Sequence, residues 1–223
     1  MSYIDALFKK DEDKIYVVER DPKKGRIFTE YDARYVFYYE DARGKHRSMT
    51  GAPLQRVQCA TNKEFIKEQR IRSNKQLYEH DINPVFRCLE ENYLGKDTPK
   101  LNVMFFDIEV DFDPDRGYST TDDPFMPITA ISCYMSWTDQ LVTFAVPPKT
   151  ISMADAKELT KRFDNTMLFE KEKDMLDAFL ELVQDADILS GWNSEGYDIP
   201  YTVGRIQKVL SSDDTRRLCF WGE

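Results

Sequence analysis

The eight residues VMFFDIEV (103–110) decide the fold expected for this chain. They form an apolar run interrupted only by Asp107 and Glu109, which stand two positions apart. Successive side chains of a strand point to opposite faces, so the two carboxylates share one face and Ile108 lies on the other. Their Cα atoms are then roughly 6.5 Å apart, which lets both carboxylates bind a pair of divalent ions. A strand whose polar face simply meets water has the same pattern, so the pair alone leaves both interpretations open.

A second informative segment is ILSGWNSEGYDIPYTVGRI (188–206). It predicts a short apolar strand, a turn from Gly191 to Gly196, and a helix with Pro200 in its first turn. Asp198 is in that first turn as well, where free N–H groups and the helix dipole stabilise a negative charge. We therefore expect Asp198 to stay ionised and available to a cation, although an ordinary capping aspartate has the same position.

The surrounding sequence predicts an α/β layer fold with a mixed central sheet. After the first strand at 102–111, we expect strands at 127–137, 140–146, 166–169 and 188–191, and helices at 153–162, 170–184 and 197–210. The first 60 residues instead contain three short strand patterns, at 13–20, 33–40 and 54–61, typical of a small antiparallel sheet or barrel. Two helices are expected next, from 61 or 62 to about 77 and from 85 to 93.

We expect two domains, residues 1–100 and 101–223. The segment KDTPK (96–100) has the composition of a linker, and Pro99 disfavours regular structure through it. A chain of 223 residues with 41% hydrophobic side chains also suits two modest domains better than one large one.

Composition limits the chemistry. Four widely spaced cysteines and only two histidines make a zinc site unexpected, and we expect the cysteines to be reduced thiols. Carboxylates must then hold any catalytic metal, which favours Mg²⁺ or Mn²⁺.

Residues 101–223 contain 11 Lys and Arg against 23 Asp and Glu, so nucleic acid would bind there only through metal ions or local basic contacts. Neither a long apolar stretch nor a signal-peptide pattern occurs, so we expect a cytosolic protein without a membrane partner.

Together the two segments resemble the first and second exonuclease motifs of family B DNA polymerases, most closely those of tailed bacteriophages. The resemblance rests on FDIE (106–109), on GWN (191–193) followed by YDIPY (197–201), and on about 90 residues between the acidic clusters. It implies a ribonuclease H-like (DnaQ-like) exonuclease fold with a mixed sheet, C-terminally incomplete. The small α+β domain at 1–100 is similar to the N-terminal domain of this family.

The resemblance also implies residue roles. Asp107, Glu109 and Asp198 would be the metal-binding catalytic carboxylates of a two-metal 3′→5′ proofreading exonuclease that uses Mg²⁺ or Mn²⁺. Asp107 would bridge both ions, Glu109 would hold the one that activates water, and Asp198 would steady the second. The substrate-binding residues would be Asn193, Tyr118 and Tyr197, with Tyr118 stacking on the terminal base. An exposed loop tyrosine is the alternative for Tyr118.

In this family a third motif, a tyrosine with an aspartate four residues later, and the polymerase motifs follow further downstream. We therefore expect the front part of a family B DNA polymerase, with little exonuclease activity without the remainder of the polymerase, whether that is on the same chain or a separate one. Its substrate would be a single-stranded DNA 3′ end or a primer-template, in the host cytoplasm if a phage encodes it. The alternative is a non-catalytic nucleic-acid-binding or scaffold fragment of a divided polymerase.

Overall fold

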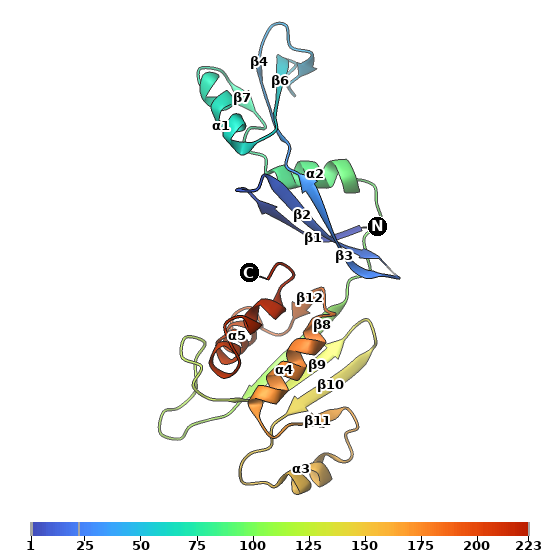
Figure 1. Cartoon of the computed structure of the whole chain (residues 1–223), viewed down its shortest axis with the longest axis vertical. Helices are drawn as coiled ribbons and strands as arrows, with labels where there is room; N and C mark the ends of the chain where they lie inside the picture. Colours follow the sequence, from blue (N-terminus) through green and yellow to red (C-terminus); the bar gives the residue numbers. More distant parts are fainter. Residues whose placement is uncertain (1, 22, 223) are drawn as a thin grey trace. The chain divides into compact units, whose positions relative to one another are not determined.

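The computed structural model describes residues 2–21 and 23–222. The chain divides into two compact units, Met1–Lys100 and Leu101–Glu223 (Figure 1). No helix in the described part of the chain has the length and apolar character needed to cross a membrane.

The first unit contains two antiparallel sheets, where the sequence predicted one sheet or barrel. One sheet has the order β1-β2-β3, with β1 (Ser2–Lys9), β2 (Lys14–Asp21) and β3 (Gly25–Asp32). The other has the order β5-β6-β4-β7, with β4 (Tyr35–Glu40), β5 (His46–Arg47), β6 (Pro53–Cys59) and β7 (Leu77–Tyr78). The helices are α1 (Asn62–Ile71) and α2 (Pro84–Tyr93). The expected extension of the first helix to Leu77 is wrong, because Leu77 pairs with Tyr39 of β4.

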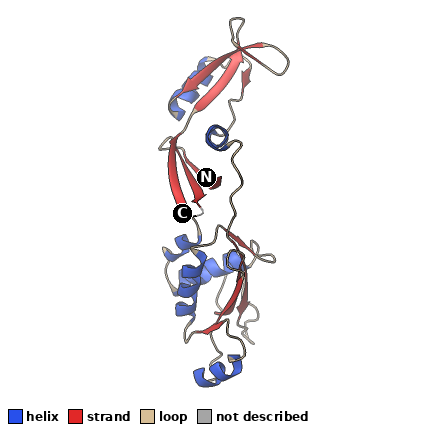
Figure 2. Cartoon of the chain, turned by 90° about the vertical axis from the view of Figure 1, so that its right-hand side faces the viewer, coloured by secondary structure: helices blue, strands red, loops and turns tan. Residues whose placement is uncertain are grey.

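The second unit has the expected mixed sheet, with strand order β11-β10-β9-β8-β12. Its strands are β8 (Val103–Val110), β9 (Ile128–Met135), β10 (Gln140–Ala145), β11 (Thr166–Leu168) and β12 (Ile188–Ser190). β8, β9 and β10 pair antiparallel, whereas β12 runs parallel to β8 and β11 runs parallel to β10. The helices are α3 (Met153–Thr160), α4 (Glu172–Val183) and α5 (Asp198–Val209), followed by the short 3₁₀ helix η1 (Asp214–Leu218). Figure 2 shows these helices and strands by type.

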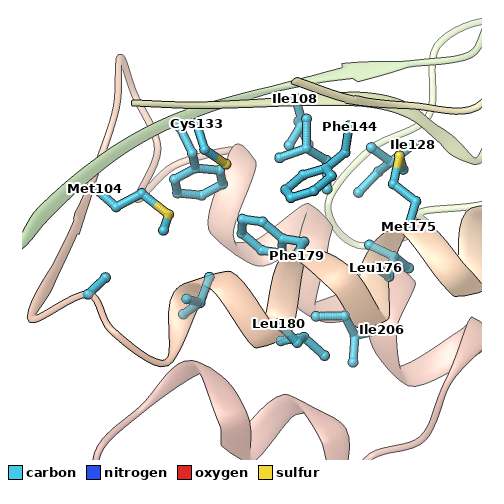
Figure 3. Close-up of a cluster of buried hydrophobic side chains, with 14 of the residues drawn as sticks. Met104, Ile108, Ile128, Cys133, Phe144, Met175, Leu176, Phe179, Leu180 and Ile206 are labelled. Atoms are coloured by element: carbon cyan, nitrogen blue, oxygen red, sulfur yellow. The ribbon is translucent and has the colours of Figure 1, made fainter. Parts of the chain in front are cut away.

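One face of this sheet forms the hydrophobic core. Met104, Phe106 and Ile108 alternate along β8 and are all buried. They belong to one cluster with the buried side chains of α4, and the Phe106 ring lies 5.7 Å from that of Phe179, centroid to centroid. Figure 3 shows Phe179 pointing from α4 toward the sheet, where Phe144 lies. The apolar face of α4 thus fixes which face of β8 is inside.

The opposite face of the sheet is open to solvent and partly apolar. Phe105, Tyr134 and Leu141 are exposed there, on neighbouring strands. The rings of Phe105 and Tyr134 are 6.3 Å apart, and Leu141 is the register partner of Tyr134. Asp107 and Glu109 are exposed on this same face of β8, as the alternation predicts.

Phe179→Ala should lower the free energy of unfolding by about 3–5 kcal/mol, because it leaves a cavity in the middle of the core. The control is Phe163→Ala, which removes the same ring from a position that is 48% exposed. We expect it to change stability by about 0.5 kcal/mol or less. Urea unfolding of the three proteins measures both effects, and equal losses would contradict the central position of Phe179.

Candidate functional site

The first part of the site is the carboxylate pair on β8. Asp107 lies opposite Ser132 in the register with β9, and Glu109 lies opposite Ala130. Both partners on β9 are small, so the space above the two carboxylates is not filled by their strand neighbours. The pair is therefore accessible to ligands on the open face of the sheet.

Asp198 reaches β8 from the first position of α5. Its side chain is buried, and its Oδ1 accepts a hydrogen bond from the backbone N–H of Ile108 at 3.2 Å. Ile108 stands between Asp107 and Glu109, so this bond brings the third expected carboxylate to the same short stretch of β8. The sequence separates Asp198 from Ile108 by 90 positions, and the fold brings them into contact.

The shortness of β12 makes this contact possible. β12 pairs with β8 only from Val103 to Phe105, so the backbone of β8 beyond that point is free to bond with α5. The chain leaves β12 through Gly191, which packs directly on β8. A Cβ atom at Gly191 would lie 2.4 Å from the carbonyl oxygen of Phe106, a distance that no larger residue tolerates.

Burial raises the pKa of Asp198 above its ordinary value of 3.8. The hydrogen bond from Ile108 acts in the opposite direction, and the negative charge of Asp107 raises the pKa further. The free N–H groups at the start of α5 therefore do not lower this pKa on balance, and the expectation that Asp198 stays ionised remains a prediction. The carboxyl is buried at the end of the helix, and loss of hydration outweighs the favourable N–H groups.

The turn between β12 and α5 holds two of the expected substrate residues. Asn193 is exposed with a left-handed φ of 53°, and its carbonyl accepts the N–H groups of Gly196 and Tyr197, both at 3.0 Å. Tyr197 is half-buried, and its ring stacks on Tyr201 at 5.3 Å. Trp192, for which the sequence predicts no role, is 92% exposed in the same turn.

Tyr118 lies in the long loop that follows β8. Tyr118 is 84% exposed, and its ring centroid lies 4.9 Å from that of Phe112, a residue that is itself 47% exposed. Phe112 was missed as a candidate, although it follows Glu109 by only three positions. Its Cα is therefore at most about 11 Å from that of Glu109.

These residues supply oxygen ligands of the kind that hard divalent cations prefer. Asp107 and Glu109 are adjacent on one face, and Asp198 is close enough for the charge of Asp107 to act on it. Within the described residues, however, no three His, Cys, Asp or Glu side chains converge into a ready-made metal cluster. The arrangement supplies a carboxylate pair and a nearby third carboxylate.

Comparison with known proteins gives the family of this site. A family described as DNA polymerase family B, exonuclease domain, matches residues 54–223, a range that contains every residue of the site. The chain belongs to this family. The prediction from the two sequence segments is confirmed. Exonuclease domains of family B polymerases generally depend on divalent metal ions, in agreement with the carboxylate-rich site.

Three viral relatives match parts of the chain. The DNA-directed DNA polymerase of Escherichia phage RB69 is 32% identical over 142 residues, which are 55% of this chain and 15% of that protein. The DNA polymerase catalytic subunit of Saimiriine herpesvirus 2 (strain 11) is 28% identical over 115 residues, 51% of this chain and 11% of the relative. The DNA-directed DNA polymerase of Enterobacteria phage T4 is 36% identical over 53 residues, which are 23% of this chain and 6% of that protein. The chain thus spans 15% or less of each relative.

Asp198→Asn should make the protein more stable at pH 7. Because the folded-state pKa of Asp198 lies above 3.8, the folded state binds this proton more tightly than the unfolded state. The free energy of unfolding therefore falls as pH rises from about 3.8 through the raised value. Asparagine keeps an acceptor for the Ile108 N–H and removes the buried charge.

Urea unfolding between pH 3.5 and pH 7 measures this difference, which should shrink toward the acid end. Asp164→Asn, at an exposed position between α3 and β11, is the control for loss of one carboxylate. A variant less stable than the native chain at pH 7 would show that Asp198 stabilises the fold as an ion.

Proposed function

We propose that this chain is the N-terminal and exonuclease portion of a DNA-directed DNA polymerase and that its site hydrolyses DNA from the 3′ end. One observation carries the proposal. Asp198 bonds to the backbone of Ile108, between Asp107 and Glu109, so the acids of both family motifs border the same short stretch of β8.

The proposed reaction is hydrolysis of the terminal phosphodiester bond, which releases a nucleotide and leaves a shortened strand. Asp107, Glu109 and Asp198 would hold two Mg²⁺ or Mn²⁺ ions, which supply activation of water and neutralisation of phosphate charge when bound. Asp107 and Glu109 are exposed and free to turn toward a ligand. Asp198 is held by its hydrogen bond and can orient a ligand without moving.

The remaining expected residues would bind the strand itself. Tyr118 is available for stacking on an unpaired base because most of its ring is exposed. Asn193 offers its amide at the surface, whereas Tyr197 is partly packed against the core and would contribute mainly its edge. We propose a single-stranded 3′ end, or the frayed end of a primer-template, as the substrate.

The partner in this function would be the remainder of the polymerase, and we propose the cytoplasm as the compartment. The cysteines are consistent with a reducing environment, because none of the four forms a disulfide. The open apolar face with Phe105, Tyr134 and Leu141 is consistent with further protein packing there.

A non-catalytic role in nucleic-acid binding is the second candidate, and the first unit favours it. Tyr38 lies opposite Arg56 in the sheet, and its ring contacts that of His46 at 5.2 Å. Tyr39 has the charged groups of Arg72 and Lys75 within 4.9 Å of its ring centre. Aromatic and basic side chains side by side suit single-stranded nucleic acid. Salt-dependent binding that survives Asp107→Ala would favour this role.

The double variant Asp107→Asn and Glu109→Gln should lose Mn²⁺ binding without unfolding. Removing two like charges from one strand face removes the ligands and relieves repulsion, so stability should stay equal or rise. Titration calorimetry measures the metal and thermal melting measures stability. The control, Glu158→Gln with Asp164→Asn, removes the same charge from the α3 region. Unchanged Mn²⁺ affinity in the first variant would return the pair to a structural role.

Hydrolysis of a 3′-labelled single strand tests the activity directly. We expect little release of nucleotides by this chain alone in Mg²⁺ or Mn²⁺, and clear release when the rest of its polymerase is supplied. In that complete system Asp198→Asn should lower the rate by about 10²- to 10³-fold, since one fixed contact to the reacting centre is lost. Asp164→Asn is again the control. A complete system without 3′ hydrolysis would exclude proofreading by this protein.

A further inference from the structure

Arg205 of α5 is a buried cation that the proposed chemistry does not use. Its Nε bonds to Oε1 of Glu172 at 2.8 Å, and a second guanidinium nitrogen bonds to Oε2 of the same carboxylate. The third nitrogen donates to the carbonyl oxygens of Pro124 at 2.9 Å and Phe125 at 3.3 Å. Glu172 in turn accepts the N–H of Ile128 at 2.8 Å. One ion pair therefore joins α4, α5 and the end of the loop after β8.

The same stretch of loop lies along α5 on both sides of Arg205. Tyr201 donates its hydroxyl to the carbonyl oxygen of Met126 at 2.8 Å. Gly204 lets the loop approach closely, because a Cβ atom there would lie 2.6 Å from Cγ of Pro124. One turn further on, Lys208 pairs with Asp123 at 3.2 Å. Residues 123–126 are thus fixed to one face of the helix.

Ser119 links residues 123–126 to the part of the loop that contains Tyr118. Its hydroxyl oxygen accepts the N–H groups of Phe125 at 2.8 Å and Met126 at 3.2 Å, and it donates to the carbonyl oxygen of Asp123 at 2.9 Å. Ser119 is buried and directly follows Tyr118. The backbone of the exposed Tyr118 is therefore one residue away from a point that is bonded to the fixed segment.

The other end of α5 contacts the carboxylate strand. Asp198 opens the helix and bonds to Ile108, seven residues before Arg205. A helix rises 1.5 Å per residue, so the two side chains leave the helix about 10 Å apart along its axis. α5 consequently touches both the strand that holds the carboxylate pair and the loop that presents Tyr118.

We propose that Arg205 is a positioning residue, which with Glu172 holds the Tyr118 loop at a fixed place on α5, the helix that Asp198 opens. This inference rests on the proposed function, because it assigns the base contact to Tyr118. The planar shape of the guanidinium group, and not only its charge, is needed to hold the loop. A lysine would keep the charge but has no planar fork to bond both carboxylate oxygens and two carbonyl groups at once.

The test measures stacking of a base, which a purely structural defect would not change selectively. A single-stranded oligonucleotide with 2-aminopurine at its 3′ end, and phosphorothioate linkages that resist hydrolysis, is titrated with the chain in Mg²⁺. Quenching of the fluorescence reports the stacked base. The native chain is compared with Tyr118→Ala, Arg205→Lys and the double variant.

We expect Tyr118→Ala to weaken binding by about fivefold or more, the range for loss of one base-aromatic stack. Arg205→Lys should weaken it by a similar or smaller factor. The double variant should bind no more weakly than Tyr118→Ala alone, because Arg205 acts through that ring. Gly204→Ala is a second route to the same effect, since it pushes Pro124 away and leaves the ion pair in place.

Arg217→Lys is the matched control. Arg217 also joins α4 to another segment, through Asp177 at 2.7 Å and Glu181 at 2.6 Å, and it pairs with Asp214; all three carboxylates lie outside the Tyr118 loop. It should lower stability and leave DNA binding unchanged. Additive effects in the double variant, or equal weakening by Arg217→Lys, would overturn the inference alone. Absence of quenching with the native chain would overturn the base contact assigned to Tyr118 and the inference with it, whereas the proposed hydrolysis is tested separately in the complete system.

Discussion

The two faces of β8 meet opposite physical requirements, and the arrangement of the second unit follows from them. Met104, Phe106 and Ile108 have to leave water, whereas Asp107 and Glu109 cannot be buried without partners at acceptable cost. Strand alternation separates the two sets completely. The apolar face of α4 therefore packs on one side of the sheet only, and the carboxylates remain accessible on the other.

The burial of Asp198 beside β8 lowers the stability of the folded chain at neutral pH. β12 ends early enough to leave the Ile108 N–H to Asp198, and the resulting burial raises the pKa of that carboxyl. Hydrogen bonds from the backbone N–H groups of Ile108 and of Asp198 itself offset only part of the lost hydration. Such a residue is expected to be retained for function, because a neutral replacement would suit the fold better. A cation beside Asp198 would favour its charged form, so ligand binding and local stability are linked.

The second unit was largely predictable because its signals are local. Its longer strands and helices have clear periodic patterns, and the bounds of its strands and of α3, α4 and α5 differ from the expected ones by only a few residues, whereas η1 was not expected. In the first unit, β1 and β3 were missed because half-exposed strands with interspersed charges have little periodicity. The end of α1 depended on a pairing between Leu77 and Tyr39 that no local pattern reveals.

Within the site, motif spacing predicted the three acids but could not predict how they are held. The burial of Asp198 depends on β8, and the bonds of Arg205 reach residues more than 30 positions away. An arginine on the inner face of an amphipathic helix was the one available signal, since a buried guanidinium requires a partner. Only its closeness to Glu109 in the sequence indicated that Phe112 could be a site residue.

The acidity of the second unit shapes how the proposed substrate would bind. A region with 23 acidic and 11 basic side chains repels a DNA strand at long range, so charge alone does not bring the two together. Divalent ions at the carboxylates would reverse that repulsion locally, and by linkage a bound phosphate would strengthen ion binding equally. Stacking on Tyr118 would add a contact that does not depend on charge. Such stacking is possible only where a base is unpaired, so this contact would favour a frayed 3′ end over a paired one.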